Sequence, residues 1–263
     1  MALERVMAVA GLTMKESARK KVAIGMMVCS ILMTLALGLV ARAMQANESS
    51  EMGLAFAVQG LLRLVATFIW VMAIFISVTA IPPELERRTT YTLFAKPLDR
   101  WEYVLGKYVG CCALLAANVI AIAAIVALML GREDPTLTVA LMKNLATFFI
   151  SYSALIALAL ALTLVLPMAV AAMVSLGLYF LSSVYGFGLQ VAQTPRLPHW
   201  ARALGAGVYH IGRLVTPRVN WLNTDRPFYE VSGHTQLEAA LCVMAYSVAV
   251  LALGTLAFSR REL

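Results

Sequence analysis

The chain has 263 residues, of which 61% are apolar and only 13% are charged, and its mean hydropathy is +0.82. This composition excludes a soluble globular domain and predicts an integral membrane protein with a single helical membrane domain. The net charge of +7 comes from basic residues that cluster beside apolar runs. Such residues suit the anionic inner leaflet of a membrane. We therefore predict membrane lipids as partners of the chain and do not predict nucleic acid.

The four cysteines all lie inside apolar runs, and no CxxC or Cys/His spacing occurs. A thiol in such a run behaves as a small hydrophobic group, so neither a disulfide framework nor a zinc site is indicated.

Residues 1–21 are predicted to form an amphipathic helix, because apolar residues recur at helical spacing from Leu3 through Val6, Met7 and Ala10 to Met14. We expect this elbow helix to lie along the inner surface of the membrane, with an ordinary cytoplasmic lead-in helix as the alternative. The apolar run that follows is too long for a signal-peptide core, so it is predicted to be a retained first span.

Six apolar runs are long enough, at 1.5 Å per residue, to cross a hydrocarbon core of roughly 30 Å. The predicted spans are 22–41, 64–81, 108–130, 145–166, 168–189 and 239–258. The predicted fold class is therefore all-α and polytopic. An even number of spans places both termini on one side, and the distribution of lysines makes that side cytoplasmic.

The longest polar segment, 190–235, is then an extracytoplasmic loop, although its five arginines run against the lysine pattern. Within it, His199 to Leu214 is predicted to form one helix. The three histidines of this loop are His199, His210 and His234. On a helix His199 and His210 would stand about 16 Å apart, too far to ligate one ion, so no metal site is predicted.

Residues 82–107 form the one densely charged segment between two long apolar runs, and we predict that it is cytoplasmic. Pro82 and Pro83 end the preceding run, after which Glu84 to about Phe94 can form a short helix. Asp99 and Glu102 have the spacing of a capping box that opens the helix leading into the third span.

Catalytic patterns are missing from the sequence. The acidic residues lie at span ends or in loops, and no HExxH helix, paired catalytic carboxylates or phosphate-binding loop occurs. The chain is therefore predicted to be a non-catalytic subunit that takes its energy from a partner. Asn118 and Gln59 could join helices by hydrogen bonds or face a transport pathway, and the sequence leaves both open.

The run PPELERRTTYTLFAKPLDRWEYVLGKYVG resembles the cytoplasmic segment of type-2, exporter-type ATP-binding-cassette permeases. MAVAGLTMKESARKKV is similar to the amphipathic elbow of that family, LVTPRVNWLNTDRPFYE to its outer loop, and FSRREL to its basic terminus. The chain is most similar to the branch associated with multicopper enzyme maturation, which includes the permease of the nitrous oxide reductase assembly transporter.

The resemblance implies two permease subunits and two ATPase subunits in the inner membrane, with ATP and Mg bound by the ATPase and no cofactor in this chain. It makes the helix after Pro83 the coupling helix. By motif position the ATPase-contacting residues would be Glu84, Glu86, Arg87, Arg88, Thr89 and Tyr91. Leu85, Leu93 and Phe94 offer apolar anchors for a groove on a partner. No substrate-binding residue is predicted.

Three functions remain open at this point. The first is a permease subunit, one of an identical pair, that moves a small or lipid-like cargo with ATP hydrolysed by its partner. The second is a mechanical transmitter that acts on an extracytoplasmic partner at 190–235 and transports nothing. The third is an ion-coupled carrier without an ATPase.

Overall fold

The computed structural model describes residues 2–46, 51–81, 99–130, 135–193, 198–215 and 233–259. Every regular element within these ranges is a helix, which confirms the all-α class. The helices are α1 Ala2–Arg19, α2 Lys21–Ala46, α3 Glu51–Val78, α6 Arg100–Leu130, α7 Pro135–Val165, α8 Met168–Gln193, α9 His199–Val215 and α10 Gly233–Ser259.

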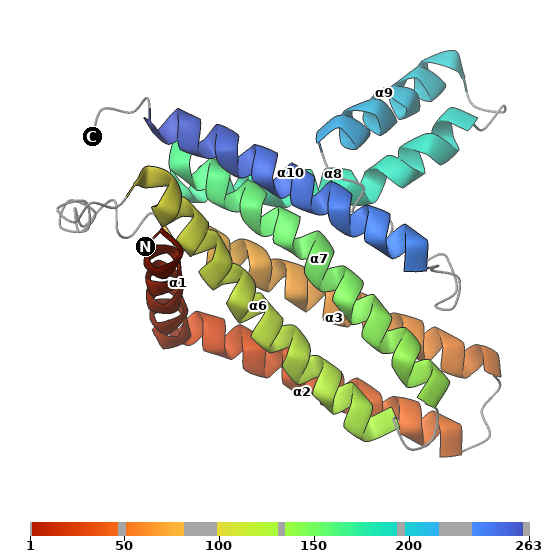
Figure 1. Ribbon diagram of the computed structural model, residues 1–263. Helices are drawn as coiled ribbons and strands as arrows, with labels where there is room; N and C mark the ends of the chain where they lie inside the picture. Colours follow the sequence, from red (N-terminus) through yellow and green to blue (C-terminus); the bar gives the residue numbers. More distant parts are fainter. Residues whose placement is uncertain are drawn as a thin grey trace.

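Four long helices, α2, α3, α6 and α7, lie side by side as a bundle, and α10 runs along α7 (Figure 1). The end of α3, the start of α6, the end of α7 and the end of α10 all meet at one end of this bundle, and α1 lies there too (Figure 1). Helix α8 leaves the bundle, and α9 folds back along it, so these two helices form an arm at the side of the molecule (Figure 1).

The core lies where α3, α6 and α7 face one another. Its fully buried side chains include Ile69 and Ile76 of α3, Leu115 and Ile122 of α6, and Ile156 of α7. Spacings of seven residues within α3 and α6 bring successive side chains back to the same helix face, which is how a mostly apolar sequence still defines a packed side.

Four helices in the described ranges are long and apolar enough to cross a membrane. These stretches are Ala23–Val40, Trp101–Met129, Leu141–Val165 and Ala240–Ala257. Two shorter apolar stretches, Leu64–Val78 in α3 and Met168–Phe180 in α8, fall where the second and fifth spans are predicted. The prediction of six spans therefore stays a prediction, with four of the crossings supported by length and composition.

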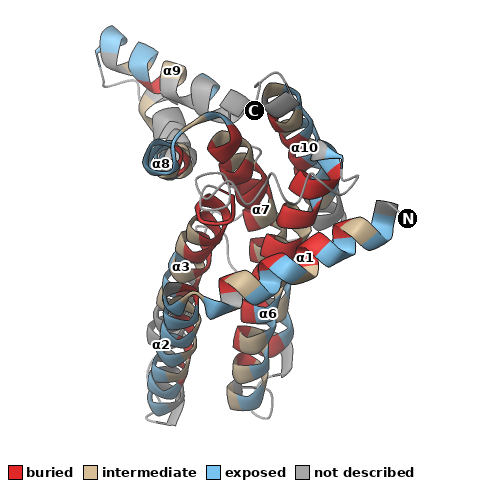
Figure 2. Ribbon diagram, turned by 90° about the vertical axis from the view of Figure 1, so that its left-hand side faces the viewer, coloured by how far each residue is buried: buried red, intermediate tan, exposed pale blue. Residues whose placement is uncertain are grey.

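Helix α1 is present where the amphipathic helix is predicted, and its position along the membrane surface stays a prediction. Val6 and Ala10 of α1 are buried, whereas Leu3, Met7 and Met14 are exposed. Figure 2 shows α1 running across α6 with its buried residues toward that helix. The apolar residues of α1 are thus divided between a protein contact and an open side.

Candidate functional site: the junction of α1 with the ends of α3 and α6

The predicted ATPase-contacting residues fall in a segment that lies outside the described residues. These are Glu84, Leu85, Glu86, Arg87, Arg88, Thr89, Tyr91, Leu93 and Phe94. The two flanks of this segment are described, since α3 leads to Ile81 and α6 follows Asp99. The candidate site is therefore built from what holds these flanks, namely α1, residues 77–81 and residues 99–111, which we call the α1 junction.

Helix α1 crosses α6 at two glycines. A Cβ atom on Gly106 would lie 2.6 Å from Val9 Cβ, and one on Gly110 would lie 2.7 Å from Thr13 Cβ and 2.9 Å from the carbonyl oxygen of Ala10. Real Cβ atoms do not approach so closely, so only glycine allows the two backbones this separation. Small residues spaced by four are the usual means of bringing helices into close contact.

The first turn of α6 is fixed from two directions through Glu102, whose side chain is buried. The backbone N–H of Asp99 donates to Glu102 Oε2 at 3.3 Å, which is the contact expected of the Glu in a capping box. Arg5 Nη1 of α1 lies 3.6 Å from the same Oε2. The sequence placed Glu102 at a helix end, but its burial and its partner on α1 come only from the packing.

A second carboxylate at the junction, that of Glu16 on α1, lies between two lysines. Glu16 Oε2 is 3.6 Å from Lys107 Nζ of α6, and Glu16 Oε1 is 3.6 Å from Lys20 Nζ. The Lys107 side chain is only 1% exposed, and its Nζ also lies 5.7 Å from the centre of the Tyr103 ring. A buried ammonium group needs such partners, because desolvation strongly disfavours an isolated charge.

Lys20 extends the junction to α3. Its Nζ donates a hydrogen bond of 2.6 Å to the carbonyl oxygen of Thr79, just beyond the last helical residue of α3. Thr79 is 59 residues away in sequence, so this contact exists only in the folded chain. Both flanks of the undescribed segment 82–98 are therefore contacted from the N-terminal region. Lys20, directly after α1, holds the α3 flank, and Arg5 and Glu16 of α1 hold the α6 flank.

Deeper in the bundle, Asn118 of α6 joins three helices. Ser30 Oγ of α2 lies 3.0 Å from Asn118 Oδ1, and Asn118 Nδ2 lies 3.1 Å from Met72 Sδ of α3. All three side chains are buried. The structure thus decides between the two roles left open for Asn118, in favour of an interhelical contact. The other candidate, Gln59, has no described side chain.

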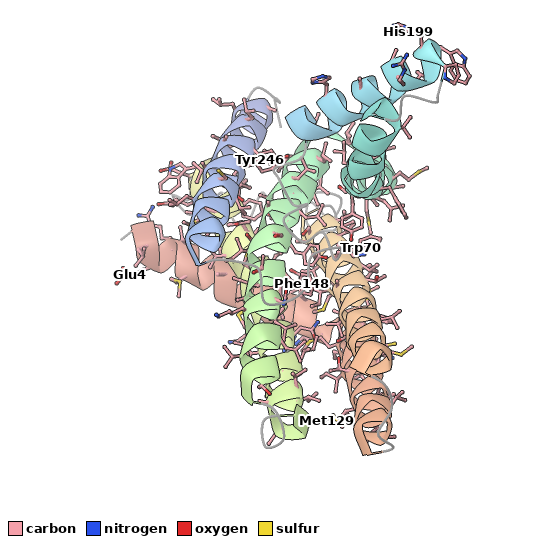
Figure 3. All side chains as sticks on the ribbon, turned by 90° about the vertical axis from the view of Figure 1, so that its right-hand side faces the viewer. Glu4, Trp70, Met129, Phe148, His199 and Tyr246 are labelled. Atoms are coloured by element: carbon pink, nitrogen blue, oxygen red, sulfur yellow. The ribbon has the colours of Figure 1, made fainter. Side chains whose placement is uncertain are left out.

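The arm is attached to the bundle through aromatic rings. Trp70 of α3 stacks on Tyr179 of α8 with ring centroids 4.2 Å apart, and Tyr152 of α7 lies 6.4 Å from Tyr179. Figure 3 shows the labelled Trp70 where α3 approaches α8. No group of three or more metal-ligating side chains occurs in the described ranges, and His199 and His210 lie on α9.

A family model described as ABC-2 family transporter protein matches residues 7–263, nearly the whole chain. The chain belongs to the ABC-2 transporter family. Membership makes this ABC-2 protein a transmembrane subunit of an ATP-binding-cassette transporter, which implies an ATPase as its partner. No curated protein matches the chain. The matched region begins at residue 7, inside α1, so the greater part of α1 and its crossing with α6 belong to the family domain.

Proposed function

We propose that this ABC-2 protein is a permease subunit whose segment 82–98 docks on a separate ATPase, and that the α1 junction passes the movement of that segment to the membrane helices. In this proposal ATP binding draws two ATPase subunits together and displaces the segment. The cargo is small or lipid-like. Two permease subunits work together in the inner membrane, with both termini of each chain on the cytoplasmic side.

The observation that carries the proposal is that α1 and Lys20, the residue that follows it, together contact both flanks of the docking segment. Lys20 contacts the end of α3, while Glu16 and Arg5 contact Lys107 and Glu102 at the start of α6. Without these contacts, a displacement of the segment could move α3 and α6 independently. Lys20 holds the end of α3, while ion pairs and a close glycine crossing hold α1 to α6. In this proposal α3 and α6 therefore move together.

The docking step is tested by Glu86→Lys, which reverses a charge in the predicted coupling helix. We expect the variant to insert into the membrane normally but to retain less ATPase on co-purification and to stimulate its turnover less. Glu133→Lys, between the predicted third and fourth spans, is the matched control and should behave like the wild type. Unchanged association and turnover in Glu86→Lys would remove the docking claim.

The mechanical transmitter remains the second candidate, because α9 exposes two large apolar side chains. Trp200 is 67% exposed and Leu204 is 63% exposed, which is suitable for a contact outside this chain. Measuring flux and ATP turnover together in liposomes separates the two functions. ATP hydrolysis that depends on the permease and moves no cargo would favour the transmitter, whereas flux in proportion to turnover supports the permease.

The resemblance to the branch associated with multicopper enzyme maturation is kept as a further part of this proposal. It rests on the pattern of residues 82–110 together with the similar elbow, outer-loop and terminal segments. An ion-coupled carrier without an ATPase has lost its support, since membership of the ABC-2 family implies an ATPase partner.

A further inference from the structure

Three exposed cations, Lys15, Arg19 and Lys21, lie around the bend between α1 and α2. Among the described residues no carboxylate forms an ion pair with any of the three. Their neighbour Lys20 differs, since it is held by Glu16 and by the Thr79 carbonyl. The bend therefore presents three positive charges that no carboxylate of the described ranges neutralises.

Below Lys21 an apolar strip runs along the exposed side of α2. Gly25, Val28 and Leu32 follow Lys21 at four, seven and eleven residues, which places all four on one face of the helix. A Cβ on Gly25 would meet nothing within 4 Å, while Val28 is 47% exposed and Leu32 is 59% exposed. Gly25 therefore exposes helix backbone between the charge and the two larger side chains.

The charged bend and the apolar strip match the headgroup and the acyl chain of a phospholipid. Positive charge at a helix end suits a phosphate headgroup, and an apolar strip within a candidate span suits the acyl chain below it. We propose that Lys15, Arg19 and Lys21 bind the headgroup of an anionic phospholipid, whose acyl chain lies along Gly25, Val28 and Leu32. This inference does not depend on the ATPase. A soluble anion has no acyl chain and would not contact the apolar strip.

The test uses the full chain in nanodiscs of phosphatidylcholine that contain a minor fraction of phosphatidylglycerol. The association of spin-labelled phosphatidylglycerol with the protein is compared with that of spin-labelled phosphatidylcholine. We expect the wild type to prefer the anionic lipid. The triple change Lys15→Gln, Arg19→Gln and Lys21→Gln should lower this preference, by roughly fivefold for each charge that contacts the headgroup.

Lys143→Gln is the control, because Lys143 is an exposed cation in the N-terminal part of α7, away from the bend between α1 and α2. It should leave the preference unchanged, and an equal loss in Lys143→Gln and the triple variant would overturn the proposal. Gly25→Trp keeps every charge and adds a bulky side chain to the strip, in open space. It should therefore displace the acyl chain and reduce binding even if the triple variant fails to fold. Retained preference in both site variants, or displacement of the lipid by inorganic phosphate alone, would also overturn it.

Discussion

Glu16→Gln is the most direct perturbation of the α1 junction, because it removes one negative charge and keeps the size of the side chain. The Glu16 carboxylate lies 3.6 Å from Lys107 Nζ, and the Lys107 side chain is 1% exposed. We expect Glu16→Gln to destabilise the protein, since a buried ammonium group loses its carboxylate. We further expect Lys107→Met to restore much of the loss when it is added to Glu16→Gln.

The magnitude follows from the geometry. At 3.6 Å and an effective dielectric constant of about 20, the attraction between the two charges is about 4 to 5 kcal/mol before desolvation is subtracted. Breaking a fully buried ion pair costs about 3 to 5 kcal/mol. Because the Glu16 side chain is 35% exposed, solvent screens the pair, and we expect a net loss of about 2 kcal/mol.

Thermal unfolding of the purified chain in detergent measures this loss. For a chain of this size about 2 kcal/mol corresponds to a decrease in Tm of roughly 4 to 8 °C. Lys15→Met removes an exposed cation without a described ion-pair partner, so it should leave Tm almost unchanged. The reasoning fails if the double variant is as unstable as Glu16→Gln alone, because the uncompensated charge of Lys107 would then not be the cause.

Three further changes test the helix contacts. Gly110→Ala should destabilise the protein by about 1 to 3 kcal/mol, because the added Cβ meets the Ala10 carbonyl oxygen. Gly60→Ala is the control, since Gly60 has open space around it, and unfolding curves should show no loss of stability for this variant. Asn118→Leu should cost about 0.6 to 1 kcal/mol in the same assay, and an unchanged stability would show that the contacts with α2 and α3 contribute nothing. Trp70→Leu should weaken the attachment of α8 by about 0.5 to 1.5 kcal/mol, seen as a broader distribution of spin-label distances between α3 and α9, and an unaltered distribution would contradict this role.

Local sequence patterns were sufficient to predict contacts and helices that involve residues close together in the chain. The capping contact between Asp99 and Glu102 spans three residues, and the structure confirms it through the Asp99 N–H. The helix predicted from His199 to Leu214 is present as α9. By contrast, the spacing of Gly106 and Gly110 was available as a signal for close helix crossing, but the sequence does not say which helix crosses there. The structure shows that it is α1.

The sequence by itself determined the class of this protein. Apolar runs of membrane length and few charges allow only helices that satisfy their own backbone hydrogen bonds. The pattern of residues 82–110 indicated the transporter family. Only the tertiary structure decided that α1 and Lys20 together contact both flanks of that segment. Lys20 and Thr79 are 59 residues apart, and Glu16 and Lys107 are farther apart still. No local spacing encodes such pairs, because they form only when packing brings distant helices together.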